Sequence, residues 1–253
     1  MVKQFVISSG HGEKVPGAIG VLNEHNEAKK VVDRVYTILT TQYNGSGYKF
    51  HDTTSTTQNK NLETIVNYHN SKSRLLDISV HFNSASASAT GSECLYYDAK
   101  SLSAAMAKAM ATALGITNRG AKERKELYFL KNTIKPAILL EVCFVTSEKD
   151  AAAYRENFEK LCQAIAKVIA EELDYTKKVT ISNYYQSGTG KYKIKKNCWA
   201  YNSLKFDKKN RVELCPKNTV YTIVGVVRYG NVYRLKTKSG LYITAKKEFV
   251  QKV

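Results

Sequence analysis

The sequence predicts two domains, an α/β domain with a mostly parallel, twisted sheet flanked by helices over residues 1–175 and a small all-β domain over residues 192–253. Residues 176–191 are expected to link them. The first prediction rests on short apolar runs that alternate with helical patterns, which is typical of a layered α/β fold. The second rests on the end of helical patterning after Asp174 and on the strongly basic composition beyond it.

The first domain is expected to alternate strands with helices. Apolar runs and period-two alternation predict strands over residues 3–8, 48–51, 75–82, 93–97, 127–130 and 137–144. Apolar residues at helical spacing predict helices over residues 24–40, 62–70, 102–114 and 148–173. Because the runs at 75–82 and 137–142 are almost continuously apolar, we expect their strands at the centre of the sheet, with helices on both faces.

Short strand patterns and turn signals define the second domain. Strands over residues 220–228 and 232–237 flank a good hairpin turn, Tyr229-Gly230-Asn231, and a third strand over 241–244 follows another turn. The preceding residues lack a helical stripe and end in a Ser/Gly-rich cluster, which is typical of a linker. These features predict a small barrel of short strands.

The composition is that of a globular protein without a membrane span. The 253 residues are 43% hydrophobic, which is enough to fill a core. No run reaches the roughly 18 apolar residues that a span requires, and the N-terminal MVKQFVISSGH lacks a signal-peptide profile, so we expect cytoplasmic synthesis. The five cysteines show no CxxC pairing, which predicts free, mostly buried thiols.

The net charge of +17 is unevenly distributed along the chain. Residues 1–175 hold 21 basic and 19 acidic residues, a net +2, whereas residues 176–253 hold 18 and 3, a net +15. All five histidines lie in the first part, while the second contains Trp199 and eight of the seventeen tyrosines. We therefore expect chemistry in the first part and surface binding in the second. Basic and aromatic residues together suit a nucleic acid or another polyanion, and the charge can also serve solubility alone.

Polar side chains lie where predicted strands or helices of the first domain begin or end. His81 is on the polar face of the strand that contains SVHFNS, and His11 follows the first strand between two glycines. Glu141 ends the apolar run AILLE, where an unpaired charge is costly. Glu24 and Glu27 open the first long helix and share a face. Each residue alone also fits a structural role, such as a salt bridge or a charge at a helix N-terminus.

Together these residues predict a metal-dependent hydrolase. In an open α/β sheet they would converge at the carboxyl ends of the strands, where sites usually form. Two histidines and one carboxylate with an open fourth position are a common catalytic zinc set. Glu141, if it is not a ligand, can move a proton from the attacking water to a leaving nitrogen. The residues alone leave the choice between Glu24 and Glu27 open.

Four ordered motifs also carry a family resemblance. Gly-His-Gly, GAIGVLNE, SVHFN and LLEVCF resemble the zinc-dependent N-acetylmuramoyl-L-alanine amidases of the type 3 class, especially those of bacteriophage endolysins, over residues 3–173. The resemblance implies that His11, Glu24 and His81 bind Zn2+ and that Glu141 is the catalytic carboxylate. It favours Glu24 over Glu27 because the matching glutamate follows a Gly-x-x-Asn pattern.

The resemblance also implies substrate contacts and contains one departure. Asn83, together with Arg119 and Lys122 in the segment 118–122, resembles substrate-groove segments of the family, although a solvated basic loop fits that segment equally well. Many members have an acidic residue shortly before the first histidine, where this chain has Ser8 and Ser9, so the support of the His11 ring is left open.

The second domain resembles the bacterial SH3-like domains that bind cell walls after endolysin catalytic domains. Its hairpin and the aromatic residues Trp199, Tyr201, Tyr233 and Tyr242 carry this looser match. Together the resemblances imply a monomeric, phage-encoded peptidoglycan hydrolase, made in the host cytoplasm and acting at the cell wall. Its partners would be peptidoglycan and anionic wall polymers rather than nucleic acid. The alternatives are a zinc peptidase that cuts another peptidoglycan amide and a non-enzymatic wall or nucleic acid binder.

Overall fold

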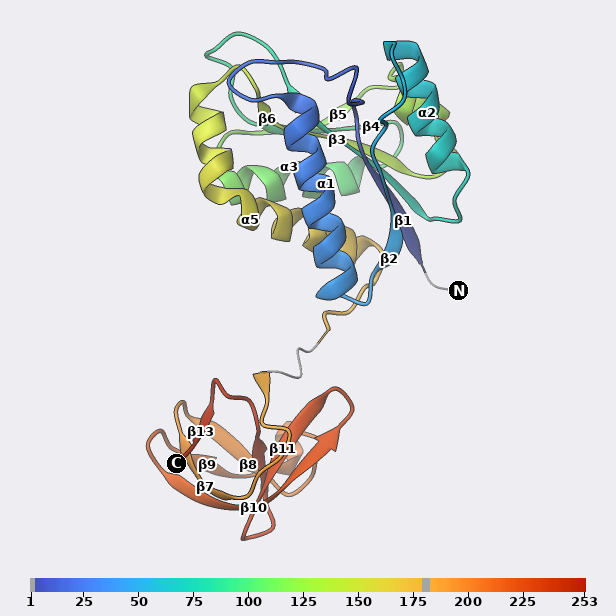
Figure 1. The fold of residues 1–253 in the computed structure, drawn as a ribbon. Coiled ribbons are helices and arrows are strands. Elements are labelled where there is room, and N and C mark those ends of the chain that lie inside the picture. Colours follow the sequence, from blue (N-terminus) through green and yellow to red (C-terminus); the bar gives the residue numbers. More distant parts are fainter. Residues whose placement is uncertain (1–2, 179–182) are drawn as a thin grey trace. The chain divides into compact units, whose positions relative to one another are not determined.

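The computed structural model describes residues 3–178 and 183–253, and the chain divides into two compact units, Met1–Lys177 and Lys178–Val253 (Figure 1). Of the predicted linker, residues 179–182 lie outside the described residues, and its last two residues belong to the first strand of the second unit. Among the described residues, no helix combines the length and apolar character that crossing a membrane requires.

The first unit contains a six-stranded sheet in the order β2-β1-β3-β6-β4-β5. Neighbouring strands run parallel except β4 and β6, which are antiparallel. The predicted central strands, β3 and β6, do lie in the middle. The strands are β1 (Gln4–Ser9), β2 (Ser46–Phe50), β3 (Leu76–Asn83), β4 (Ser92–Tyr96), β5 (Asn118–Glu123) and β6 (Ala137–Phe144).

Five helices cover both faces of this sheet, as predicted for an α/β fold. The main core lies between the sheet and α1, α3 and α5, while a smaller apolar cluster lies between the other face and α2 and α4. The helices are α1 (Glu24–Thr41), α2 (Gln58–Asn70), α3 (Lys100–Leu114), α4 (Tyr128–Asn132) and α5 (Glu148–Glu172).

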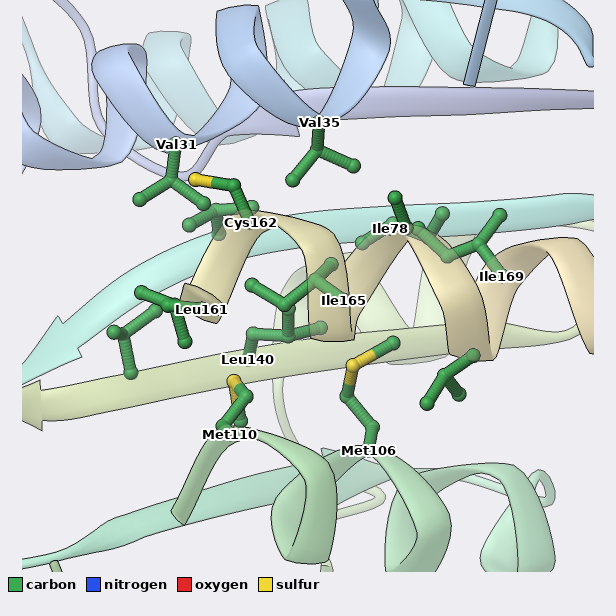
Figure 2. Close-up of a cluster of buried hydrophobic side chains, with 14 of the residues drawn as sticks. Val31, Val35, Ile78, Met106, Met110, Leu140, Leu161, Cys162, Ile165 and Ile169 are labelled. Atoms are coloured by element: carbon green, nitrogen blue, oxygen red, sulfur yellow. The ribbon is translucent and has the colours of Figure 1, made fainter. Parts of the chain in front are cut away.

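The main core is built from the helical stripes that the sequence predicts. In Figure 2, side chains of α1, α3 and α5, among them Val35, Met106 and Ile165, meet over Ile78 of β3 and Leu140 of β6. All five side chains are fully buried. Interiors are close-packed, so truncating a side chain such as Leu140 to alanine typically costs about 2–5 kcal/mol. This core fixes β3 and β6, which carry three of the predicted site residues, His81, Asn83 and Glu141.

One local prediction for the first unit is wrong, and one alternative is not met. The expected strand at 127–130 is part of α4, where Phe129 and Leu130 pack into the smaller apolar cluster. A four-residue apolar run has no periodicity that separates a strand from one helical turn. The segment 118–122, for which a solvated loop was the equal alternative, is in β5, an edge strand whose residues are all exposed or half-buried. Because none of its residues is fully buried, the segment lacks the alternation of apolar and polar residues that predicts a strand.

The second unit is an all-β body with its own core. Its sheet has the order β13-β7-β10-β11-β12-β8-β9, and Tyr192, Leu235 and Ile243 are among its fully buried side chains. The predicted hairpin is present, with a Gly230-Asn231 loop between β10 and β11. The strands are β7 (Gly190–Ile194), β8 (Cys198–Tyr201), β9 (Arg211–Cys215), β10 (Val220–Tyr229), β11 (Val232–Thr237), β12 (Tyr242–Thr244) and β13 (Val250–Lys252).

The cysteines follow the sequence prediction. All five are free thiols, and Cys198 alone among them is half-buried rather than buried. None of them belongs to the group of residues described next.

Candidate metal centre

Two histidines reach the same point from neighbouring parallel strands. His11 lies in the loop just after β1, and His81 is near the end of β3, which pairs with β1. Their rings are perpendicular, with centroids 5.0 Å apart. A Cβ atom on Gly10 would lie 1.8 Å from Nε2 of His81, so the close approach of the loop to this ring requires glycine.

Glu24 brings a carboxylate to the two imidazoles from the N-terminus of α1. Asn23 caps this helix by accepting a hydrogen bond from the Asn26 backbone N–H. Oε1 of Glu24 lies 3.3 Å from Nε2 of His11 and 3.1 Å from Nδ1 of His81. Within the described part of the chain, the three ligand atoms lie within 4.8 Å of one another, which makes this a group that could hold a metal ion.

The protonation states of these residues also suit a cation. Burial alone would raise the pKa of Glu24, but its hydrogen bonds with His11 and His81 outweigh burial and hold the pKa far below its usual range. Burial lowers the pKa of His81, which favours the neutral imidazole. A carboxylate and a neutral imidazole are the forms that bind metal ions. The donor set therefore fits a divalent metal ion such as zinc.

Glu27, the alternative carboxylate, lies outside this group. It accepts a hydrogen bond of 3.0 Å from the hydroxyl of Tyr154 and pairs with Lys30 at 2.8 Å. Its role is to connect α1 with α5. Of the two acidic residues in the first turn of α1, the structure brings Glu24 alone to the histidines.

The His11 loop is held by contacts to its main chain. Nδ1 of His25 donates to the backbone carbonyl of His11 at 2.8 Å, and Oγ of Ser9 donates to the same oxygen at 3.1 Å. Ser8 instead contacts His69 at 3.0 Å. Among the described residues, Nδ1 of the His11 ring is buried without a hydrogen-bond partner. The His11 loop is thus held through its main chain, and sequence analysis missed the role of His25.

Glu141 lies beside His81 on the same face of the sheet. In the β3–β6 ladder it is paired with His81, and in the β4–β6 ladder it is paired with Glu93. Its Oε2 atom is buried and has no partner among the described residues. Burial, followed by the negative charges of Glu24 and Glu93, raises the pKa of Glu141 well above its usual value. Perturbed, unpaired carboxyl groups of this kind cluster at catalytic sites.

The structure brings two of the three predicted substrate-binding residues together. Asn83 donates a hydrogen bond of 3.0 Å to Glu93, and Arg119 pairs with the same carboxylate at 2.8 Å. Lys122 is exposed on β5, paired with Leu95 of β4. Sequence analysis missed Glu93, although a single carboxylate in the short strand 93–97 was a signal of the same kind as Glu141.

Comparison with known proteins places the first unit in a family. The sequence pattern of the family described as N-acetylmuramoyl-L-alanine amidase (Amidase_3) matches residues 5–171. The chain belongs to this family. Residues 184–250 match a domain of unknown function, DUF5776. The amidase family predicted from the four motifs is therefore confirmed for the first unit, while zinc dependence stays a prediction.

Individual relatives extend this comparison. The endolysin of Bacillus phage SPP1 is 29% identical over 273 residues, which cover 99% of this chain and 98% of that protein. An uncharacterized protein of Clostridium perfringens (strain 13 / Type A) is 31% identical over 180 residues, covering 68% of this chain, and the chain spans only 51% of that protein's length. The catalytic domain of CwlV, an N-acetylmuramoyl-L-alanine amidase from Bacillus (Paenibacillus) polymyxa var. colistinus, is 28% identical with a TM-score of 0.58, covering 68% of this chain and 98% of the domain.

Proposed function

We propose that this protein is a peptidoglycan hydrolase that cleaves the amide between the lactyl group of N-acetylmuramic acid and the first L-alanine of the stem peptide. One observation carries the proposal: a ligand set of two imidazoles and a carboxylate lies beside a buried, unpartnered carboxyl group. Membership of the amidase family and similarity to a phage endolysin along nearly the whole chain support the same activity.

His11, Glu24 and His81 would hold a zinc ion. When bound, zinc supplies a Lewis acid that polarises the amide carbonyl and makes water a stronger nucleophile. The chain keeps these three side chains in place before the ion binds, since Gly10 leaves room for the His81 ring and Ser79 contacts its second nitrogen at 3.0 Å. Such outer contacts typically change metal affinity by about 10–100-fold.

Glu141 would move the proton during hydrolysis. Its side chain shares a sheet face with His81, and its Oε2 atom has no competing partner in the described part of the chain. As a base it takes the proton of the attacking water, and as an acid it returns that proton to the leaving nitrogen of L-alanine. The pKa of Glu141, raised by burial and by the neighbouring carboxylates, suits the second step, because these surroundings favour the protonated form that gives the proton to the leaving nitrogen.

Asn83, Arg119 and Lys122 would contact the substrate around this centre. Asn83 follows His81 on the same face of β3, and Arg119 reaches the neighbouring Glu93 from β5. Both are within reach of a glycan or peptide that lies across the strand ends. Their present partner, Glu93, keeps them oriented in the absence of substrate.

The second unit would hold the enzyme on the wall. In this proposal residues 1–175 are the catalytic domain, 176–191 the linker and 192–253 an SH3-like wall-binding domain. The excess of basic residues suits anionic wall polymers. Trp199 is 36% exposed and lies 5.0 Å from the guanidinium of Arg211, so a flat ring and a positive charge are presented together. Sugar faces and anionic groups could both be bound there, with the protein acting as a monomer at the cell wall after synthesis in a host cytoplasm.

One assay tests the proposed reaction. Purified walls are incubated with the protein, and new amino termini and reducing ends are labelled. Free L-alanine amino groups without new reducing sugars are expected. A different new amino terminus would indicate a zinc peptidase, and no new ends at all would indicate a wall or nucleic acid binder without activity. The Glu141→Gln variant is the matched control, because it replaces one carboxylate oxygen of the proposed proton carrier with an amide nitrogen.

A further inference from the structure

A pocket of about 290 Å³ extends from the metal centre along the same face of the sheet. His81 and Glu141 line one end. Its other walls come from α2, from β4 and from the start of α4, and they include Leu62, Leu95 and Phe129. The pocket is therefore a continuation of the candidate active site, and its walls from α2, β4 and α4 have no role assigned above.

Arg124 places a positive charge beside the apolar walls of this pocket. Among the described residues that line it, Arg124 is the only lysine or arginine. It follows β5 directly, and its backbone N–H donates to the carbonyl of Tyr96 at 2.9 Å. Its side chain is half exposed and pairs through Nε with Glu126. Within residues 3–178, the two terminal nitrogens of its guanidinium have no recorded partner and can bind a carboxylate as a fork.

The spacing along β4 relates Arg124 to the proton carrier. Glu93 is paired with Glu141, and Tyr96, whose carbonyl binds Arg124, is three residues further along β4. At about 3.3 Å per residue, this places the Arg124 backbone roughly 10 Å down the sheet from Glu141. When the Arg124 side chain turns back into the pocket, it spans part of the distance to Glu141. A substrate group one residue beyond the leaving nitrogen, about 7 Å from that nitrogen, then lies within reach of the guanidinium.

The proposed reaction determines which part of the substrate enters this pocket. Glu141 returns a proton to the leaving nitrogen, so the leaving peptide lies on the side of the centre that Glu141 shares with the pocket. That peptide begins with L-alanine, whose methyl group suits apolar walls. The next residue is a D-glutamyl unit joined through its side-chain carboxyl, and its α-carboxyl group is either free or amidated.

We propose that this pocket binds the leaving stem peptide and that Arg124 recognises the free α-carboxylate of its second residue. The proposal rests on the amidase function proposed above and adds a specificity to it. The enzyme prefers stem peptides with a free carboxylate over those in which this group is an amide, because the amide offers no charge to the guanidinium.

The test compares two soluble muramoyl peptides that differ only in whether this carboxyl group is free or amidated. For the full chain we expect kcat/KM to be about 10–100-fold higher for the free carboxylate, the usual range for a charge-assisted hydrogen bond. Arg124→Gln should lower kcat/KM on the carboxylate substrate by a similar factor, mainly through KM, and should lower it far less on the amide. Arg124→Lys should keep part of the preference.

Lys125→Gln is the matched control. Lys125 is the next residue in the chain but does not line the pocket, and it pairs with Glu123 at 3.2 Å. This variant should keep the full preference. Equal cleavage of both substrates by the unmodified protein, or an equal loss on both in Arg124→Gln, would overturn the role of Arg124 and leave the amidase function intact. Cleavage of neither substrate at the lactyl–alanine bond would overturn both proposals.

Discussion

The two units of this chain place their polar side chains in opposite ways. In the first unit, nearly neutral overall, buried or half-buried polar groups such as Glu24, His81 and Glu141 meet at one end of a sheet. In the second unit, 17 basic and 3 acidic residues over 178–253 give a net charge of +14, and the fully buried side chains are almost all apolar. A buried polar group has few alternative hydrogen-bond partners, and this makes it reactive. An exposed charge instead attracts oppositely charged partners at a distance. This contrast agrees with the proposal that the first unit performs the chemistry and the second binds a surface.

The largest expected effect is the loss of turnover in Glu141→Gln. A glutamine keeps the shape of the side chain but cannot carry the proton, so kcat should fall by about 10²–10⁴-fold while the metal stays bound. Steady-state kinetics on soluble muramoyl peptides and metal analysis of the same preparation check this. Glu27→Gln, on a residue that pairs with Tyr154 and Lys30, is the control. Near-normal rates in Glu141→Gln would show that another group moves the proton.

Substitution of Gly10 tests how closely the residues of the metal centre pack. In Gly10→Ala the new methyl group would lie 1.8 Å from the His81 ring, so the ring or the loop must move. We expect the affinity for zinc to fall by about 10–100-fold, the range found when the surroundings of a metal ligand are disturbed. Titration with a competing chelator measures it. Gly225→Ala in the second unit is the control, because a Cβ atom there meets nothing within 4 Å. Equal zinc affinities of Gly10→Ala and Gly225→Ala would contradict the close packing of Gly10 against the His81 ring.

Removal of residues 178–253 tests the role assigned to the second unit. The shortened chain keeps the whole of the first core, so its rate on small soluble substrates should stay within about two-fold of the full chain. Its binding to purified walls should be at least about tenfold weaker at low salt, and the difference should shrink as salt screens the charges. A pelleting assay over a range of salt concentrations measures this. Equal wall binding by the full chain and the shortened chain would contradict the proposed targeting role of the second unit.

Acid should act more strongly on the first unit than on the second. Asp52 is buried, and although burial would raise its pKa, hydrogen bonds from Asn61, Ser55 and Thr54 hold the pKa well below its usual range. A lowered folded pKa gives stability that is present above the unfolded value of about 3.9 and is lost as the pH falls below it. Between pH 6 and pH 3 the unmodified first unit should therefore lose about 1 kcal/mol more unfolding free energy than Asp52→Asn does.

Glu248 in the second unit is the control for this acid effect. Hydrogen bonds from Lys196 and Lys246 lower the pKa of this exposed carboxylate to about 2, but solvent screens the pairs. Glu248→Gln should therefore leave the acid dependence of unfolding nearly unchanged. Denaturant unfolding at the two pH values, followed separately for each unit, distinguishes the two variants. An equal response to both substitutions would contradict the contrast between buried and exposed charges.

Much of the first unit was predictable because its signals are local. The apolar runs of β3 and β6 and the helical stripe of α1 follow from a few consecutive residues. His11 and His81 could be placed at strand ends for the same reason. The choice of Glu24 over Glu27 needed the family resemblance, because both residues share one helix face and differ only in what the folded chain brings near them.

The remaining features depend on distant parts of the chain. β5 is an edge strand of polar residues, and its sequence pattern resembles that of a loop. Glu93 and Arg124 come close to the site because β4 pairs antiparallel with β6 and β5 follows on its other side. No short window of sequence reports that order of strands. The SH3-like interpretation of the second unit stays a prediction for a related reason, since short strands with common turns fit several small barrels.

Metal binding tests the central claim most directly. Zinc should bind the full chain with a stoichiometry of one ion, measured by calorimetry together with metal analysis after dialysis. Glu24→Gln and His81→Ala should each lose this site, and Glu27→Gln should keep it, because Glu24 but not Glu27 lies with the two histidines. Retention of a single tight zinc ion by both Glu24→Gln and His81→Ala would contradict the account.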